Sequence, residues 1–112
     1  MKIIAIEEIP GMVAPKHYDL LGRNIFNAQG TKVTFTRMEK TGRCDPHIHD
    51  SAAQLFIILK GEMLFKSATD ETLVKQGNAV LFDAGEVHSN DNAADGETEY
   101  LTITVTATAH TA

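Results

Sequence analysis

Two histidines stand two positions apart in the segment Gly42-Arg43-Cys44-Asp45-Pro46-His47-Ile48-His49, and Gln54 and Gly61 follow downstream. In an extended strand, side chains two residues apart point to the same face, so His47 and His49 can approach one ion together. Imidazole nitrogens are good ligands for transition metals. The segment therefore predicts a metal site, with Gln54 close to the histidine pair at the start of the next apolar strand.

A second segment carries a third histidine. It runs from Gly77 through Asp83-Ala84-Gly85-Glu86-Val87 to His88 and ends at Asn92, and fifteen residues separate it from Gly61. The first segment resembles the first cupin motif, written G-x5-H-x-H-x(3,4)-E-x6-G, and the second resembles G-x5-P-x-G-x2-H-x3-N. The resemblance spans roughly residues 31–107. It implies an all-β fold, the double-stranded β-helix or jelly-roll barrel.

The resemblance also implies a ligand set and a cofactor. The metal ligands would be His47, His49 and His88 with Gln54 as the fourth, and the cofactor one divalent ion among zinc, manganese, nickel, iron and cobalt. Gln54 replaces the glutamate of the motif, which removes one negative charge and makes a bound ion a stronger Lewis acid. Two smaller departures are Asp83 in place of the motif proline and a spacing before His47 that is one residue shorter.

Alternation of apolar and polar residues predicts several short strands. The expected strands cover residues 31–38, 54–59, 63–66, 72–74, 79–82 and 99–106, with the second and third paired as a hairpin across Lys60-Gly61-Glu62. Ile3 to Ile9 is a further candidate strand, and Tyr18 to Arg23 a turn or a short helix. We therefore expect an N-terminal segment (1–30), a barrel (31–107) and a frayed tail (108–112).

Composition limits the partners. The formal net charge of −5 argues against nucleic acid and against an anionic membrane surface, and no apolar run is long enough to span a bilayer. Cys44 is the single cysteine, so no internal disulfide forms and a reducing, cytoplasmic location is expected. Cupins of this size commonly pair, so a homodimer is expected, with Ile3-Ile4-Ala5-Ile6 as the candidate contact.

Three further side chains have two interpretations each. Arg37 shares a strand face with Val33 and Phe35; it either holds a substrate carboxylate in the barrel or reaches solvent from the end of a strand. Tyr100 is either a proton donor for catalysis or a packed aromatic. Cys44 is either a residue at the pocket mouth or a small buried one. His17 and His110 lie outside both motifs, and we expect structural or exposed roles for them.

The sequence supports three functions. The first is a metal-dependent enzyme that isomerises, cleaves or ring-opens a small oxygen-rich molecule, as implied by resemblance to cupins with a His, His, Gln, His set, such as the uronate-linearising and polyketide-cyclising ones. Residues 101–106 lack the acid and the arginine of the uronate cupins, so that specific chemistry is not carried over. The alternatives are an iron-dependent dioxygenase and a non-catalytic module that binds a small molecule or a metal.

Overall fold

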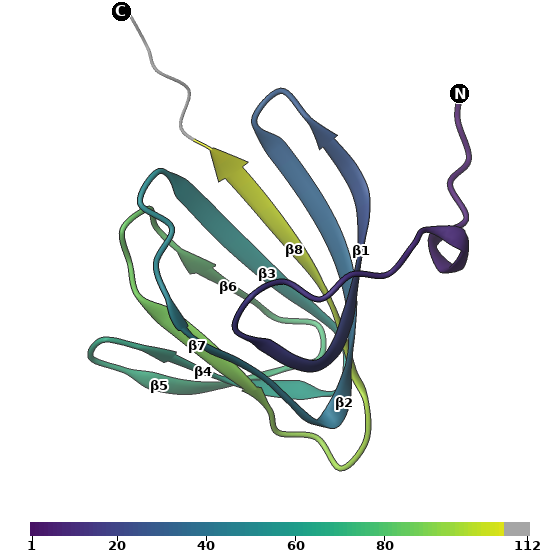
Figure 1. The fold of residues 1–112 in the computed structure, drawn as a ribbon. Helices are drawn as coiled ribbons and strands as arrows, with labels where there is room; N and C mark the ends of the chain where they lie inside the picture. Colours follow the sequence, from purple (N-terminus) through teal and green to yellow (C-terminus); the bar gives the residue numbers. More distant parts are fainter. Residues whose placement is uncertain (107–112) are drawn as a thin grey trace, which may run out of the picture.

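The long strand β2 (Thr31–His47) joins the two halves of the molecule. Its first half pairs with β8 (Thr98–Thr106) and its second half with β7 (His88–Asn92), both antiparallel. The computed structural model describes residues 1–106; the tail predicted at 108–112 and His110 lie outside the described residues. Figure 1 shows how β2 curves from one half of the sheet into the other, so that the strands wrap into a nearly closed barrel.

Six further elements complete the described chain. The strand order is β5-β4-β7-β2-β8-β3-β6, with β1 added beside β2. Their bounds are β1 (His17–Ala28), β3 (Ala52–Lys60), β4 (Glu62–Ser67), β5 (Glu71–Lys75), β6 (Ala79–Phe82) and the 3-10 turn η1 (Ile6–Glu8). The predicted all-β jelly-roll is confirmed, because the eight strands form one sheet that wraps into a nearly closed barrel.

Three local expectations were wrong. Strands β3 and β4 do not form a hairpin: β3 pairs with β6 and β8, whereas β4 pairs with β5 and β7. The turn at Gly61 takes the chain from one half of the sheet to the other. Gly61 has a φ of +84°, and an added Cβ would lie 3.0 Å from the Glu97 carbonyl oxygen. The segment 3–9 contains η1 instead of a strand, and 18–23 lies within strand β1 instead of a turn or helix.

The four strands β2, β8, β3 and β6 have two faces of different character. Their register aligns Lys32 with Thr104 and Gln54, and Thr34 with Thr102 and Phe56, on the face that turns into the barrel. The alternate residues form an apolar outer face, which comprises Val33, Phe35, Leu55, Ile57, Leu81, Leu101 and Ile103. The interior is thus polar near the open end, and the apolar core lies deeper, around Met38, Ile58, Met63, Phe65 and Tyr100.

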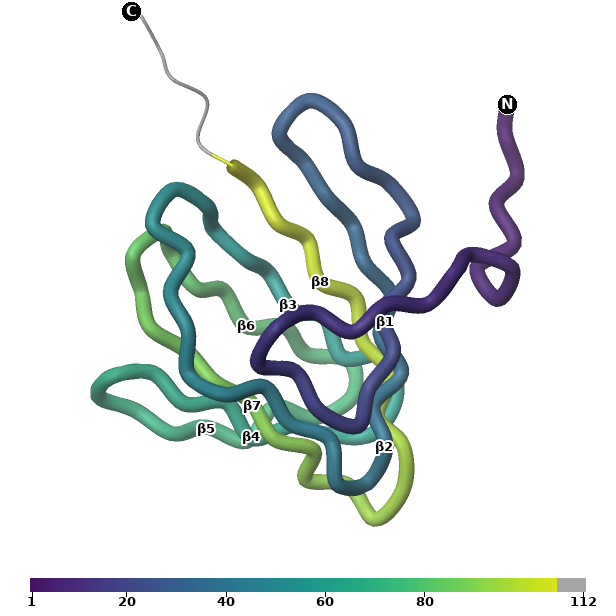
Figure 2. Tube along the Cα trace, viewed as in Figure 1, coloured from purple at the N-terminus to yellow at the C-terminus, as the bar shows by residue number. Residues whose placement is uncertain are grey.

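The N-terminal segment runs outside the barrel before it enters β1, as Figure 2 shows in purple. Met12 makes an isolated antiparallel bridge with Gly22, with both backbone hydrogen bonds formed at 2.8 and 2.9 Å. This bridge fixes residues 12–14 against one side of the barrel opening. Over residues 1–106, no helix has the length and apolar character that a membrane crossing requires.

Candidate metal centre

Three histidines from two separate parts of the chain meet at one end of the barrel. His47 is the last residue of β2 and lies directly opposite His88, the first residue of β7, in the strand register. His49 stands just beyond the end of β2 and turns back toward the pair. One ring nitrogen of each histidine lies within 4.8 Å of the other two, so the three side chains can hold one metal ion. The predicted convergence of these histidines is therefore present.

Backbone carbonyls orient two of the three rings. Nδ1 of His47 donates to the Asp45 carbonyl at 2.8 Å, and Nδ1 of His88 donates to the Glu86 carbonyl at 3.3 Å. Donation from Nδ1 places the ring proton there and leaves Nε2 with its lone pair. Nε2 of His88 and Nε2 of His49 are buried and have no hydrogen-bond partner in the described chain. At His88 this leaves a bare lone pair, which is what a metal ion requires, and the unpartnered His49 nitrogen offers the same lone pair when the ring proton is on Nδ1.

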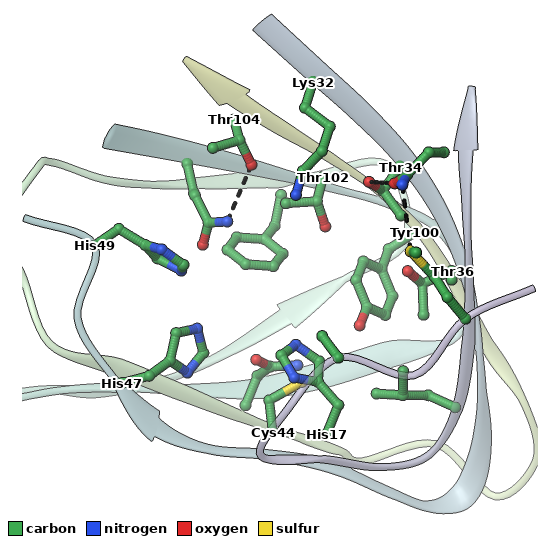
Figure 3. A pocket seen from close by; sticks show the side chains of 18 residues that line it. His17, Lys32, Thr34, Thr36, Cys44, His47, His49, Tyr100, Thr102 and Thr104 are labelled. Carbon is green, nitrogen blue, oxygen red and sulfur yellow. Dashed lines mark hydrogen bonds between the residues drawn. The ribbon is translucent and has the colours of Figure 1, made fainter. Parts of the chain in front are cut away.

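Gln54 offers a fourth donor atom, an amide oxygen, at the same end of the barrel. It lies on β3 and is buried, and its Nε2 donates to the Thr104 hydroxyl at 3.0 Å (Figure 3). Its Oε1 is buried without a hydrogen-bond partner, like the two histidine nitrogens. A buried amide oxygen without a partner is costly unless something else satisfies it. The donor set of three imidazoles and one amide oxygen fits a divalent transition metal.

Burial favours the neutral form of His88 and of His49. The pKa of His88 falls to about 4, first because burial penalises the charged form and then because of the nearby His47. His88 is held in place by stacking on Phe82, with ring centroids 4.5 Å apart. The pKa of His49 is also lowered, mainly by burial, with smaller contributions from His47 and Lys32. Neutral imidazoles bind metal without first having to lose a proton.

A cavity of about 150 Å³ adjoins the histidines (Figure 3). It is smaller than the roughly 300–1,000 Å³ of sites for drug-sized ligands, so it suits a small metabolite. Hydroxyl and amide groups are prominent in its lining, which includes Thr34, Thr36, Thr102, Thr104, Asn24 and Asn90. Among the described residues that line it, none is aspartate or glutamate.

The two residues predicted to be catalytic lie in different places. Tyr100 lines the cavity and is almost completely buried. Burial raises the pKa of its phenol, so the hydroxyl remains protonated. Arg37 lies on the opposite face of β2, outside the cavity, where its guanidinium pairs with Glu99 at 2.9 Å and with Glu7 at 2.8 Å. Arg37 therefore does not line this cavity, and no contact with it supports the catalytic role predicted for this residue.

Two cavity residues were given no place in the site from the sequence: a structural or exposed role was expected for His17, and no role was assigned to Lys32. His17, at the start of β1, lines the cavity and its ring lies 5.7 Å from that of His47. Lys32 lines the cavity as well. The period-two alternation separated the two faces of β2 but did not show which face turns inward, so it could not identify Lys32 as a cavity residue. Cys44 also lines the cavity, but it is buried, and burial raises the pKa of its thiol to about 12. A thiol in this state behaves as a small buried residue.

Comparison with known proteins identifies the family. A family model described as Cupin domain matches residues 34–104, which include all three histidines and Gln54. Among curated proteins, an oxalate-binding protein from Thermotoga maritima is 29% identical over 59 residues, which are 53% of this chain and 49% of that protein. The chain thus matches about half the length of this curated relative.

Several solved structures share the fold. A predicted oxalate decarboxylase from Thermotoga maritima has a TM-score of 0.83 and 16% identity, covering 95% of this chain and 100% of that one. KdgF from Halomonas sp. has a TM-score of 0.82 and 10% identity, with 96% of each chain covered. The polyketide cyclase RemF from Streptomyces resistomycificus has a TM-score of 0.79 and 16% identity, covering 99% and 88%. At these identities the likeness establishes the fold alone.

Proposed function

Because the chain belongs to the cupin family, whose model covers the barrel and its histidines, we propose that it is a metal-dependent protein that acts on a small oxygen-rich molecule. In this proposal His47, His49, His88 and Gln54 hold one divalent transition metal. The favoured reaction class is isomerisation, lyase chemistry or ring opening.

One observation carries the proposal. Three buried atoms that can bind a metal, Nε2 of His49, Nε2 of His88 and Oε1 of Gln54, lack a hydrogen-bond partner in the described chain. Oδ1 of Asn90, which also lines the cavity, lacks one as well. Leaving one such atom unsatisfied costs about 1–3 kcal/mol, so a cluster of three is expected only where a bound group compensates. A metal ion satisfies all three lone pairs at once.

The neutral ligand set determines what the bound ion supplies. With no carboxylate ligand, the ion keeps its full double charge, polarises carbonyl or hydroxyl oxygens and lowers the pKa of a bound water. The protein's own contribution is a wall of hydroxyls, Thr34, Thr36, Thr102 and Thr104, that can hydrogen-bond a polar ligand. Tyr100 presents a protonated phenol, so in this proposal it donates a hydrogen bond rather than acting as a base.

A second candidate function is a binding module without catalysis. The observation that favours it is the cavity lining, because the described residues around the cavity offer no carboxylate to serve as a general base. The matched relative from Thermotoga maritima is named for binding oxalate, which supports a small organic acid as the ligand in either case. An iron-dependent dioxygenase is the remaining enzyme alternative.

The experiment that tests the proposal combines metal loading with substrate screening. Metal-free protein is titrated with zinc, manganese, iron, cobalt and nickel, and the loaded forms are mixed with oxalate, hydroxy acids, sugar acids and diketones while products are followed by NMR. Product formation without oxygen uptake supports the isomerase or lyase. Oxygen uptake by the iron form indicates the dioxygenase, and ligand binding without turnover indicates the binding module. Failure of every metal to bind contradicts the proposal.

The predicted homodimer also stays a proposal, and we place it on the apolar outer face defined above. On this face the register aligns Val33 with Ile103, Leu55 and Leu81 in one row across four strands, without a charge. Two copies of an acidic chain can meet on this uncharged row with little repulsion, and the ion pair of Arg37 with Glu99 lies further along the same face. The solution mass by light scattering tests this: a dimer that Ile103→Lys converts to monomer supports it, and a monomeric wild-type protein contradicts it.

A further inference from the structure

We propose that Lys32 is a second anchor for the ligand in the cavity, beside the metal centre. The ligand is then a small dianion, with one anionic group at the metal centre and the other at the Lys32 ammonium. This inference rests on the proposed function, because it assigns the substrate class of the same site. It adds a binding residue that lies outside both histidine segments.

The position of Lys32 follows from strand register. Lys32 on β2 is opposite Thr104 on β8, and Thr104 is opposite Gln54 on β3. Neighbouring strands lie about 4.8 Å apart, so the backbones of Lys32 and Gln54 are separated by roughly 10 Å along one inward-facing row. Figure 3 shows the Lys32 side chain turned into the cavity, with its nitrogen on the side of Thr102. The ammonium and the histidine cluster thus share one small space.

Lys32 has no anionic partner of its own. None of the ion pairs found in residues 1–106 includes it, although the chain has 15 aspartates and glutamates. Arg37, five residues along the same strand but on its outer face, pairs with two glutamates. Lys32 is exposed where it lines the cavity, and no aspartate or glutamate lines it there, so its ammonium is free to bind the charge of a ligand.

Charge balance indicates a dianion. Neutral ligands leave a divalent ion with its full charge, and Lys32 adds a further positive charge within the same cavity. The described lining residues contribute no negative charge, although the whole chain is acidic, with a net charge of −5. A positively charged cavity in an acidic protein selects anions, and two separated positive charges select two anionic groups. The small volume limits the ligand to a short dicarboxylate or a similar acid.

The test compares Lys32→Met with wild type and with the control Lys66→Met, which removes an exposed lysine on β4 outside the cavity. Lys32→Arg serves as the conservative variant. Each protein is first titrated with zinc, and the zinc-loaded forms are then titrated with oxalate, malonate, succinate and acetate by calorimetry. We expect Lys32→Met to bind zinc as well as wild type. Its affinity for the best dicarboxylate should fall about 10- to 100-fold, the range for a hydrogen bond between charged groups.

Three outcomes discriminate the claims. The anchor is supported if Lys32→Met loses affinity for dicarboxylates and no longer prefers one chain length. In that case acetate binding should change little, and Lys32→Arg should restore dicarboxylate binding. Equal dicarboxylate affinity in Lys32→Met, Lys66→Met and wild type overturns it and leaves the metal centre standing. If wild-type protein binds no zinc or other divalent ion, the proposed function fails and the anchor fails with it.

Discussion

The side-chain amide of Gln54 is fixed by Thr104: its Nε2 lies 3.0 Å from the Thr104 hydroxyl oxygen across two neighbouring strands. Because the amide nitrogen is used in this bond, the amide oxygen is the atom left free, and it is buried without a partner. The orientation of the Gln54 amide is thus set by Thr104, a residue outside the proposed ligand set.

Thr104→Val should weaken metal binding. The valine has nearly the same shape as threonine but cannot accept the amide hydrogen bond, so the Gln54 oxygen is no longer held toward the histidines. Loss of such a supporting bond typically costs 10- to 100-fold in metal affinity. Competitive titration of zinc against a fluorescent chelator measures the change. Thr104→Ser, which keeps the hydroxyl, should behave like wild type; equal affinity in the valine variant would show that the amide needs no support.

The metal-free protein should lose stability in acid between pH 6.5 and about 4. In this range His88 in the folded protein stays neutral, since its pKa falls to about 4, whereas in the unfolded chain it gains a proton near 6.5. The unfolded state then binds more protons, so the free energy of unfolding increases with pH, by at most about 1.4 kcal/mol per pH unit for one group. Urea unfolding at several pH values measures the slope.

The contribution of His88 to this slope is isolated by His88→Gln, which cannot take up a proton there. Its free energy of unfolding should depend less steeply on pH between 4 and 6.5 than that of metal-free wild type. The carboxylates and the other histidines are common to both proteins, so they cancel in the difference. Identical slopes would contradict the low pKa of His88.

Cys44 should be unreactive in the folded protein. Burial raises the pKa of its thiol to about 12, which makes the thiolate fraction at pH 8 about a thousandfold smaller than for an exposed cysteine. A colorimetric disulfide reagent should therefore label the native protein very slowly and the urea-unfolded protein at once. Rapid labelling of the native protein would mean that the cavity opens to solvent.

Arg37→Met should leave ligand binding in the cavity unchanged. The ion pairs of Arg37 with Glu7 and Glu99 lie on the outer face, where the arginine side chain is 32% exposed and that of Glu7 62%. Partly exposed pairs of this kind contribute at most about 1 kcal/mol, so a small loss of stability is expected. Anion titration of the zinc-loaded variant should match wild type. Weakened binding would instead support the catalytic role predicted for Arg37.

The fold and three of the proposed ligands were predictable because their signals are local. The spacing of His47 and His49 follows from strand geometry, and the motif around His88 fixes the third histidine. Strand β1 was missed because Tyr18 to Arg23 contains Asp19 and Gly22, two residue types typical of turns, and has few alternating apolar positions. In the structure Asp19 has a positive φ within the strand. Its strand structure is imposed by pairing with β2.

Other features depend on long-range packing that no local pattern encodes. Which face of residues 31–38 turns inward is decided by the pairing of β2 with β8, and this places Lys32 in the cavity and Arg37 outside it. His17 reaches the cavity only because β1 aligns it with Cys44. The predicted β3–β4 hairpin failed for a similar reason, because each strand finds partners distant in sequence.

The metal content of purified protein tests the central claim most directly. Protein purified without added metal is examined by elemental analysis, before and after it is loaded with metal. His88→Ala is treated in the same way, together with the control His17→Ala, which removes a cavity histidine outside the cluster. The account predicts about one divalent transition metal ion per chain for wild type and for His17→Ala, and little for His88→Ala, with all three proteins folded by circular dichroism. A folded wild-type protein that retains no metal after loading, or a His88→Ala variant that binds it equally well, would contradict the account.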